Sequence, residues 1–280
     1  MNLVTYLGPE GTFSHQAALY WALNNPGAEL RPVADLLEAV QEVIDGRAQV
    51  AVLPAENSIE GTVNLTLDLL LERPDLSICG EIVLEVRHCL ATLASSVEEI
   101  TAVYSHSQAL AQCRRFIKKK LPAVTVSAVS STAAAMRQAA ADRRLAAIGP
   151  VFAARLYNLP VLYHDIQDYP GNKTRFLVVG KDKKMPPTGS DKTSLVLALP
   201  ENRPGGLYRA LAVFAAAEIN LTRIESRPTK KELGEYLFFL DCEGHAEVEP
   251  LRSVLRELEP KTALLKILGS YPKYRGEQDA

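Results

Sequence analysis

The feature that most constrains the fold is the alternation of short apolar runs with helical patterns across residues 1–180. Apolar runs at 3–7, 49–53 and 102–105 each precede a polar loop, and a helical pattern follows each loop. Parallel strands need long crossover connections, which are usually helices, so this alternation is typical of α/β architecture with a largely parallel sheet. We therefore predict an α/β fold for this part of the chain.

The segment KDKKMPPTGSDK (181–192) interrupts this pattern, because it is charged, contains two prolines and a glycine, and holds no apolar run. We predict that it links two domains. Beyond it, residues 193–272 show strand and helix patterns in the order β-α-β-β-α-β, which is the ferredoxin-like arrangement. The predicted domains are thus 1–180 and 193–272, followed by a tail at 273–280.

The composition excludes several classes of protein. Of the 280 residues, 47% are hydrophobic, and 31 Lys+Arg against 33 Asp+Glu give a formal net charge of −2. This balance predicts that the chain binds neither nucleic acid nor an anionic membrane. The N-terminus, MNLVTYLG, lacks the pattern of a secretory signal, and no apolar stretch could span a bilayer, so we predict a cytoplasmic protein. The widely spaced cysteines and histidines predict buried, reduced thiols and no metal site.

Polar side chains gather where predicted strands lead into predicted helices. Ligands of α/β proteins bind at such junctions, and the free N–H groups of helix N-termini suit anions. The junction residues include Thr12, Asn57, Ser58, Ser105 and Thr132. Ser, Thr and Asn are also the preferred N-cap residues, so a single junction could be a cap without a ligand. Four such junctions fit a cleft for a small carboxylate, which Arg175 could bind through two hydrogen bonds.

The loop motifs occur together in an order that resembles the prephenate dehydratase family. They are GPEGTFSHQAA (8–18), AENSIEGTV (55–63), YSHSQAL (104–110), SSTAAA (130–135) and NKTRFLVV (172–179). The segment after the linker resembles the ACT regulatory domain of that family. Its motifs are PGGLYRAL (204–211), INLTRIESRP (219–228), YLFFLDCEGH (236–245) and LGSYP (268–272). The resemblance covers nearly the whole chain.

The resemblance implies a two-lobed, periplasmic-binding-protein-like catalytic domain with a cleft between its lobes. We expect one lobe at 1–78 and 155–180 and the other at 79–154. The implied reaction converts prephenate to phenylpyruvate, water and carbon dioxide in L-phenylalanine biosynthesis. No cofactor is needed, because the ring itself accepts the electrons. The implied ACT domain binds L-phenylalanine as an allosteric inhibitor, and the family implies self-association as a dimer or tetramer.

Matching the family's motifs residue by residue also implies an active site. Thr174 would donate a hydrogen bond to the departing hydroxyl, and Glu56 is the alternative acid. The residues that would bind the substrate are Thr12, Asn57, Ser58, Ser105, Gln108, Gln112, Thr132, Arg175 and Phe176. Phe176 is also a candidate for the core, because it opens an apolar strand.

The ACT motifs imply an effector site as well. Its residues would be Gly205, Gly206, Leu207, Asn220, Leu221, Thr222, Glu225, Ser226 and Arg227. Glu225 and Arg227 are two residues apart on one strand face, where they could pair with each other or across an interface. Two residues depart from the family's pattern. Ser107 replaces a usual proline, which loosens that loop, and Gly206 replaces a usual alanine, which could alter effector affinity.

Two other functions stay open at this point. Arogenate dehydratase acts on a substrate with an amino group in place of the keto group. A non-catalytic amino-acid sensor is disfavoured, because sensing needs no hydroxyl beside Arg175. Some members of the family carry a chorismate mutase domain in front. Since the first predicted strand begins at Leu3, we expect a monofunctional chain.

Overall fold

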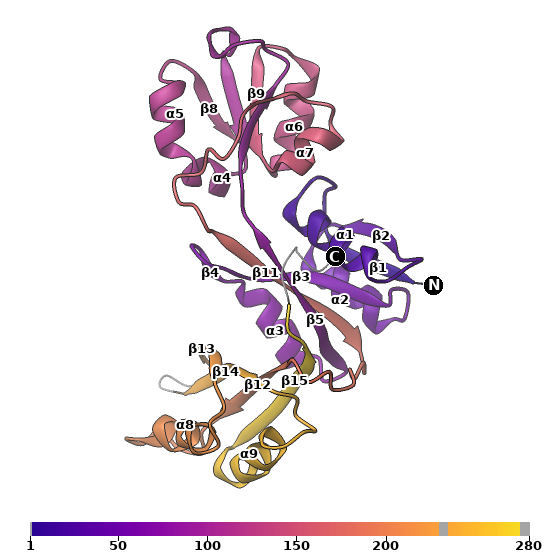
Figure 1. The fold of residues 1–280 in the computed structure, drawn as a ribbon, viewed down its shortest axis with the longest axis vertical. Coiled ribbons are helices and arrows are strands. Elements are labelled where there is room, and N and C mark those ends of the chain that lie inside the picture. Colours follow the sequence, from indigo (N-terminus) through magenta and orange to yellow (C-terminus); the bar gives the residue numbers. More distant parts are fainter. Residues whose placement is uncertain (1, 230–234, 275–280) are drawn as a thin grey trace. The chain divides into compact units, whose positions relative to one another are not determined.

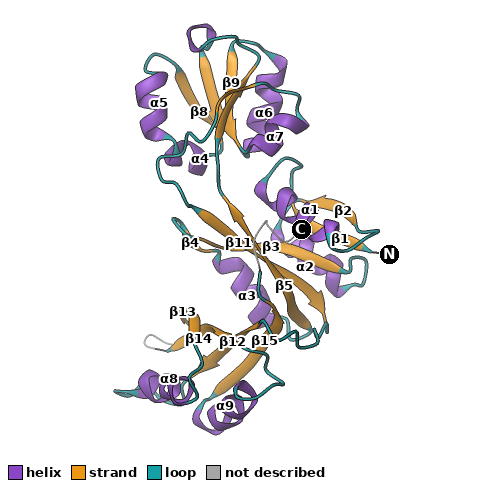
Figure 2. Cartoon of the chain, viewed as in Figure 1, coloured by secondary structure: helices purple, strands orange, loops and turns teal. Residues whose placement is uncertain are grey.

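The computed structural model describes residues 2–229 and 235–274 (Figure 1). Three β-sheets organise the described residues, and helices pack against them (Figure 2), so the predicted mixed α/β architecture is confirmed. The chain divides into two compact units. Unit 1 contains Met1–Asn64 and Ile82–Phe176, and unit 2 contains Leu65–Glu81 and Leu177–Ala280. No helix in the described ranges is long and apolar enough to span a membrane.

The first sheet has the strand order β2-β1-β3-β11-β5, and the short strand β4 pairs with β3. Its strands are β1 (Leu3–Leu7), β2 (Glu29–Val33), β3 (Val50–Asn57), β4 (Gly61–Thr62), β5 (Leu76–Glu85) and β11 (Lys173–Lys181). β1 lies parallel to both β2 and β3. Helices α1 (Phe13–Leu23) and α2 (Leu36–Ile44) provide the crossovers. β3 continues beyond its apolar run as far as Asn57, so the AEN motif is part of the sheet.

The second sheet has the strand order β10-β6-β9-β7-β8. Its strands are β6 (Cys89–Thr92), β7 (Ala102–Ser105), β8 (Thr125–Ala128), β9 (Leu145–Gly149) and β10 (Val161–Tyr163). The short helix η1 (Val97–Glu99) precedes β7, and four α-helices follow: α4 (Ser107–Gln112), α5 (Arg114–Lys120), α6 (Thr132–Ala141) and α7 (Val151–Leu156). β7 is parallel to β8 and β9, whereas β6 is antiparallel to β9. Small buried residues of α6, such as Ala135 and Ala139, let that helix pack closely on the sheet.

Two local features differ from the patterns in the sequence. The pattern over 107–119 predicts one helix, but the chain forms α4 and α5, with a break at Cys113. β10 pairs with β6, so residues 161–163 belong to the second sheet, whereas the expected lobe limits assign 155–180 to the lobe of the first sheet. A three-residue strand is too short to leave a recognisable pattern. The lobe and domain limits themselves stay a prediction.

The third sheet has the strand order β13-β14-β12-β15. Its strands are β12 (Asp191–Ala198), β13 (Leu221–Pro228), β14 (Tyr236–Glu243) and β15 (Leu264–Pro272). Helices α8 (Gly206–Ala216) and α9 (Leu251–Leu258), with the short helix η2 (Glu259–Lys261) after α9, complete the predicted β-α-β-β-α-β order. Phe214 and Leu258 are almost fully buried between these helices and one face of the sheet.

The opposite face of the third sheet holds helix α3 (Asn64–Glu72) within unit 2. The Arg227 guanidinium donates to both carboxylate oxygens of Asp68, at 2.6 and 3.3 Å. The Lys266 ammonium donates to the carbonyls of Leu70 and Leu71, at 2.7 and 3.1 Å, and so caps the last turn of α3. Three charged or capping contacts therefore tie α3 to strands β13 and β15.

Gly269 of β15 is the position where backbone approaches backbone most closely in unit 2. A Cβ placed there would lie 2.2 Å from the carbonyl oxygen of Ile78 and 2.8 Å from its nitrogen. We expect Gly269→Ala to lower the free energy of unfolding by about 1–3 kcal/mol, the usual cost of overpacking, in denaturant titrations. Gly206→Ala is the matched control, because its Cβ would lie 3.1 Å from the flexible tip of Leu199 and 3.8 Å, an ordinary contact distance, from the Glu201 carbonyl oxygen. Equal stability of the two variants would contradict the close contact.

Candidate active site

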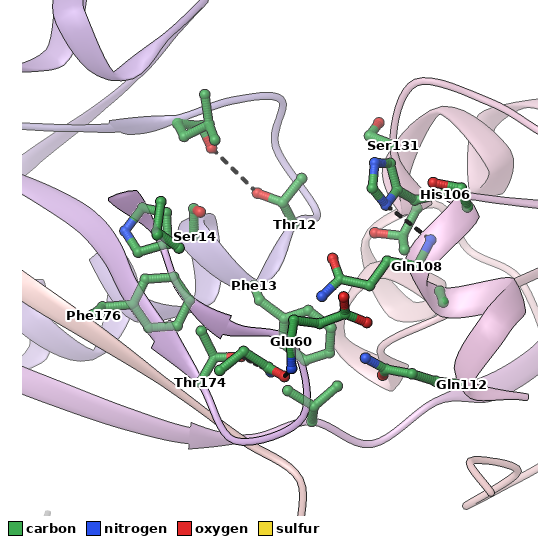
Figure 3. A pocket seen from close by; sticks show the side chains of 18 of the residues that line it. Thr12, Phe13, Ser14, Glu60, His106, Gln108, Gln112, Ser131, Thr174 and Phe176 are labelled. Carbon is green, nitrogen blue, oxygen red and sulfur yellow. Dashed lines mark hydrogen bonds between the residues drawn. The ribbon is translucent and has the colours of Figure 1, made fainter. Parts of the chain in front are cut away.

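A cavity of about 800 Å³ lies in unit 1, where loops of the first and second sheets face each other (Figure 3). Polar side chains from both sheets line it. Those from the first sheet and its loops are Thr12, Ser14, Asn57, Glu60, Thr62 and Thr174, and those from the second are His106, Ser107, Gln108, Gln112, Ser130, Ser131 and Thr132. A volume of this size is typical of small-molecule sites.

Helices α1 and α6 are two of the helices that begin at the cavity. Thr12 is the N-cap of α1 and accepts a hydrogen bond from the backbone of His15, at 3.3 Å. Ser131 is the N-cap of α6 and accepts from the backbone of Ala134, at 3.0 Å. The remaining N–H groups of each first turn have no partner within the helix, and the helix dipole favours negative charge there. Both ends suit a carboxylate.

The residues found to line the cavity include no lysine or arginine, and Glu60 is the one carboxylate among them. Hydroxyls, amides, two imidazoles and backbone N–H groups are its other polar groups. Phe13, Val86 and Phe176 supply apolar walls. A negatively charged ligand in this cavity would meet mainly neutral dipoles, which interact more strongly where water is excluded.

Thr174 lies on β11 and Asn57 at the end of β3, and their side chains meet in the cavity. The Asn57 amide donates to the Thr174 hydroxyl oxygen at 2.8 Å. The amide oxygen of Asn57 accepts from the backbone N–H groups of Ile59 and Glu60, both at 3.0 Å, which sets the orientation of the amide. Thr174 thus receives one hydrogen bond at its oxygen and keeps its own O–H as a donor.

The structure brings seven of the expected substrate-site residues to the cavity. They are Thr12, Asn57, Gln108, Gln112, Thr132, Thr174 and Phe176. Figure 3 shows Gln108 and Gln112 extending toward Thr174 from the other side of the cavity. Phe176 is 1% exposed, so it serves the core and the cavity wall together.

Four expected residues do not line the cavity. Successive side chains of a strand alternate between faces, so Arg175 lies on the face of β11 opposite to Thr174 and Phe176. On that face the Arg175 guanidinium lies 4.0 Å from the Glu56 carboxylate. Ser105 is fully buried and donates to the Ile148 carbonyl at 2.5 Å, while the hydroxyl of Ser58 donates to Asn172 at 3.0 Å. The expectation that these side chains touch the ligand has no support in this geometry.

Sequence reasoning missed His88, which also lines the cavity. It is 2% exposed, and its ring makes an edge contact with Phe13. Burial lowers the pKa of His88 to about 4, and the hydrogen bond between its Nε2 atom and the Gln112 amide oxygen opposes this shift only in part. The imidazole is therefore neutral at pH 7. A lone histidine outside any motif gave no signal that could have identified it.

The expected effector residues occupy both faces of the third sheet. Gly205 and Gly206 begin α8, and Gly205 has φ +77, which glycine adopts without strain. Within β13, the register pairs Ser226 with Phe238 on the face that packs against α8 and α9, and Arg227 with Leu237 on the other face. Arg227 pairs with Asp68, and Glu225 lies 3.7 Å from Arg223. On this face, Arg227 thus contacts helix α3, and Glu225 contacts a neighbour on its own strand.

Comparison with known proteins gives the family. A model described as prephenate dehydratase matches residues 4–184, and one described as ACT domain matches residues 193–260. The chain belongs to the prephenate dehydratase family. The prephenate dehydratase of Methanocaldococcus jannaschii is 42% identical over 274 residues, which cover 97% of this chain and 98% of that protein. The bifunctional chorismate mutase/prephenate dehydratase of Aquifex aeolicus is 48% identical over 270 residues, which are 96% of this chain and 73% of that protein.

A solved structure shows the same architecture. The prephenate dehydratase of Arthrobacter aurescens in complex with L-Phe is 36% identical, with a TM-score of 0.86, and the match covers 97% of this chain and 90% of that chain. The recognition of a prephenate dehydratase with an ACT domain, and the fold it implied, are confirmed by these matches.

The Thr174 hydroxyl can be tested directly. We expect Thr174→Val, which keeps the shape and removes the O–H, to lower kcat by about 10²-fold or more, at the lower end of what proton donation contributes. Thr174→Ser keeps the hydroxyl and should retain most of the rate. Steady-state kinetics with prephenate measures both, and circular dichroism checks the fold. Equal rates for the two variants would remove the hydroxyl from the mechanism.

Proposed function

We propose that this chain catalyses the decarboxylating dehydration of prephenate to phenylpyruvate and that L-phenylalanine inhibits it through the ACT domain. The observation that carries the site assignment is the hydrogen bond from Asn57 to Thr174, because it leaves a hydroxyl donor in a cavity whose lining includes no lysine or arginine. Membership of the family supports the reaction, and the match to an ACT domain supports the regulation.

The chemistry needs little from the protein beyond one donor and an oriented substrate. The bond between the ring and its carboxylate carbon breaks, and its electron pair enters the ring. The pair of the C–O bond leaves with the ring hydroxyl, which takes up a proton and becomes water. Aromatisation drives the step, so the obstacle is the poor leaving group. A hydrogen bond or proton supplied to that oxygen lowers the barrier.

In our proposal Thr174 supplies that hydrogen bond. Its oxygen already accepts from Asn57, so its O–H points to the substrate oxygen, and polarisation by Asn57 strengthens the donation. The two carboxylates of prephenate would lie at the N-termini of α1 and α6, beside Thr12 and Thr132. Gln108 and Gln112 would donate to the remaining oxygens. A dry, neutral surrounding of the ring carboxylate favours its loss as carbon dioxide.

A second candidate substrate, arogenate, is favoured by one feature. Glu60 is a carboxylate at the cavity, and arogenate carries an ammonium where prephenate has a keto group. An opposite charge at that point would favour the ammonium. Prephenate and arogenate therefore need a direct comparison.

We expect cofactor-free turnover of prephenate by the wild type, followed through the absorbance of phenylpyruvate in base. Glu60→Gln should raise the ratio of kcat/KM for prephenate to that for arogenate by about fivefold, since it removes one charge interaction of about 1 kcal/mol. The same variant serves both substrates, so misfolding would lower both rates and leave the ratio unchanged. If the wild type turned over neither prephenate nor arogenate, the catalytic proposal would be wrong.

Helix α3 offers a route from the ACT domain to the cavity. The third sheet holds α3 through the Arg227–Asp68 pair and the Lys266 cap. The chain enters α3 directly from Thr62 and Val63, which line the cavity. In our proposal, phenylalanine binding shifts the third sheet, and α3 carries the shift to the loop that holds Glu60 and Asn57. The effector must bind one state more tightly for this to occur.

Asp68→Asn tests this route. The substitution keeps the shape of the side chain and removes the charge that pairs with Arg227, so we expect the phenylalanine concentration for half-inhibition to rise about tenfold, a coupling loss of about 1.4 kcal/mol. Uninhibited kcat/KM should stay within about twofold. Glu257→Gln is the matched control, because its pair with Lys261 is exposed and far along the chain from α3. Unchanged inhibition of Asp68→Asn would rule out the route.

We also propose that the chain self-associates. Strand β13 is an edge of the third sheet, and edge strands pair readily with other chains. Ile224 on that strand is 48% exposed, and Tyr208 at the start of α8 is 74% exposed. Apolar side chains of this kind are typical of interfaces. The cytoplasmic location stays a prediction from the sequence.

A further inference from the structure

The orientation of Gln112 in the cavity is set by a buried network that the reaction chemistry does not require. Gln112 ends α4 of the second sheet and is itself buried. Its amide oxygen lies 3.2 Å from the His88 Nε2 atom and 3.2 Å from the Asn172 Nδ2 atom. His88 lies between β5 and β6, and Asn172 immediately precedes β11. Both stretches that connect the two sheets thus supply a contact to one oxygen.

The contacts of Asn172 with Ser58 determine which group donates and which accepts in each hydrogen bond of this network. The backbone N–H of Lys173 donates to the Ser58 hydroxyl oxygen at 3.0 Å, and that hydroxyl donates to the Asn172 amide oxygen at 3.0 Å. The Asn172 side chain therefore turns its NH₂ group toward Gln112, and Gln112 must accept that hydrogen bond with its amide oxygen. His88, facing the same oxygen, must carry its proton on Nε2.

A second observation shows that the orientation of the His88 ring is constrained by its surroundings. Its Nδ1 atom is buried and has no hydrogen-bond partner in the described structure. An unsatisfied buried acceptor destabilises the fold, and such groups in native proteins call for an explanation. The Nε2 contact to Gln112 supplies one, because it holds the ring in this place despite the loss at Nδ1.

We infer that His88 and Asn172 are positioning residues that hold the Gln112 carboxamide with its NH₂ group toward the substrate. Figure 3 shows the Gln112 side chain directed into the cavity from α4. With its oxygen occupied by two donors, Gln112 has its two N–H groups for an anionic or carbonyl oxygen. This assignment rests on the proposed function, and it adds a histidine and an asparagine that act through Gln112. Because Gln112 lies on α4, which packs against β9 of the second sheet, the same network ties that sheet to the first.

Three variants test the inference with prephenate as the substrate. His88→Leu removes one donor and should raise KM about tenfold with kcat within about threefold, the effect of losing one oriented hydrogen bond to a charged group. His88→Gln can place an NH₂ group near the position of Nε2 and should restore most of the affinity. Asn172→Asp keeps the oxygen that accepts from Ser58 but replaces the NH₂ group that donates to Gln112 with a second acceptor oxygen. The carboxamide should then turn over, and KM should rise at least as much.

A double-mutant comparison separates positioning from general stabilisation. In a Gln112→Leu background, His88→Leu should cause no further rise in KM, since the group it positions is gone. Additive effects, or an unchanged KM in His88→Leu and Asn172→Asp while the wild type turns over prephenate, would overturn the inference alone. A wild type without turnover would overturn the proposed function and this inference with it. Thermal unfolding of each variant identifies loss of fold. If His88→Leu does not fold, the KM values of His88→Gln and Asn172→Asp test the inference in its place.

Discussion

The site depends on the way Asn57 holds Thr174. Asn57 sits at the last position of β3, where two backbone N–H groups of the following turn fix its amide oxygen and leave its NH₂ group for the threonine. A hydroxyl is a weak acid and rotates freely, so it is a useful donor only when a neighbour occupies its acceptor side. Both residues lie on adjacent strands of one sheet, which keeps their distance constant while loops move.

Around this pair the cavity works with neutral dipoles. Its lining within the described chain holds no lysine or arginine, and the Arg175 guanidinium, which was expected to bind substrate, lies on the other face of its strand beside Glu56. Helix N-termini and amides compensate negative charge without the strong binding that a buried cation would give to the ground state. Electrostatic preorganisation of this kind favours a transition state in which charge moves from the carboxylate to the departing oxygen.

Much of the architecture could be read from the sequence, because apolar periodicity and turn residues report directly on buried strands and helix starts. The order of elements in 193–272 and the grouping of Thr12, Asn57, Thr132 and Thr174 at one cavity are examples. Strand alternation explains why Glu56 and Arg175 do not line the cavity: motif residues that are neighbours in the chain point to opposite faces of the sheet. Tertiary contacts determine the place of His88 in the site, the pairing of β10 and the helix break at Cys113, so no local sequence pattern predicts these features.

The central claim is that a hydroxyl that does not titrate near neutrality, and not a carboxylic acid, assists the departing oxygen. The most direct measurement is the pH profile of kcat/KM for prephenate from pH 7.5 to 9.5. The account predicts values within about twofold across this range, because neither Thr174 nor the amides around it titrate there and His88 is already neutral. A fall of about tenfold per pH unit, as loss of an essential carboxylic acid proton would cause, would contradict it.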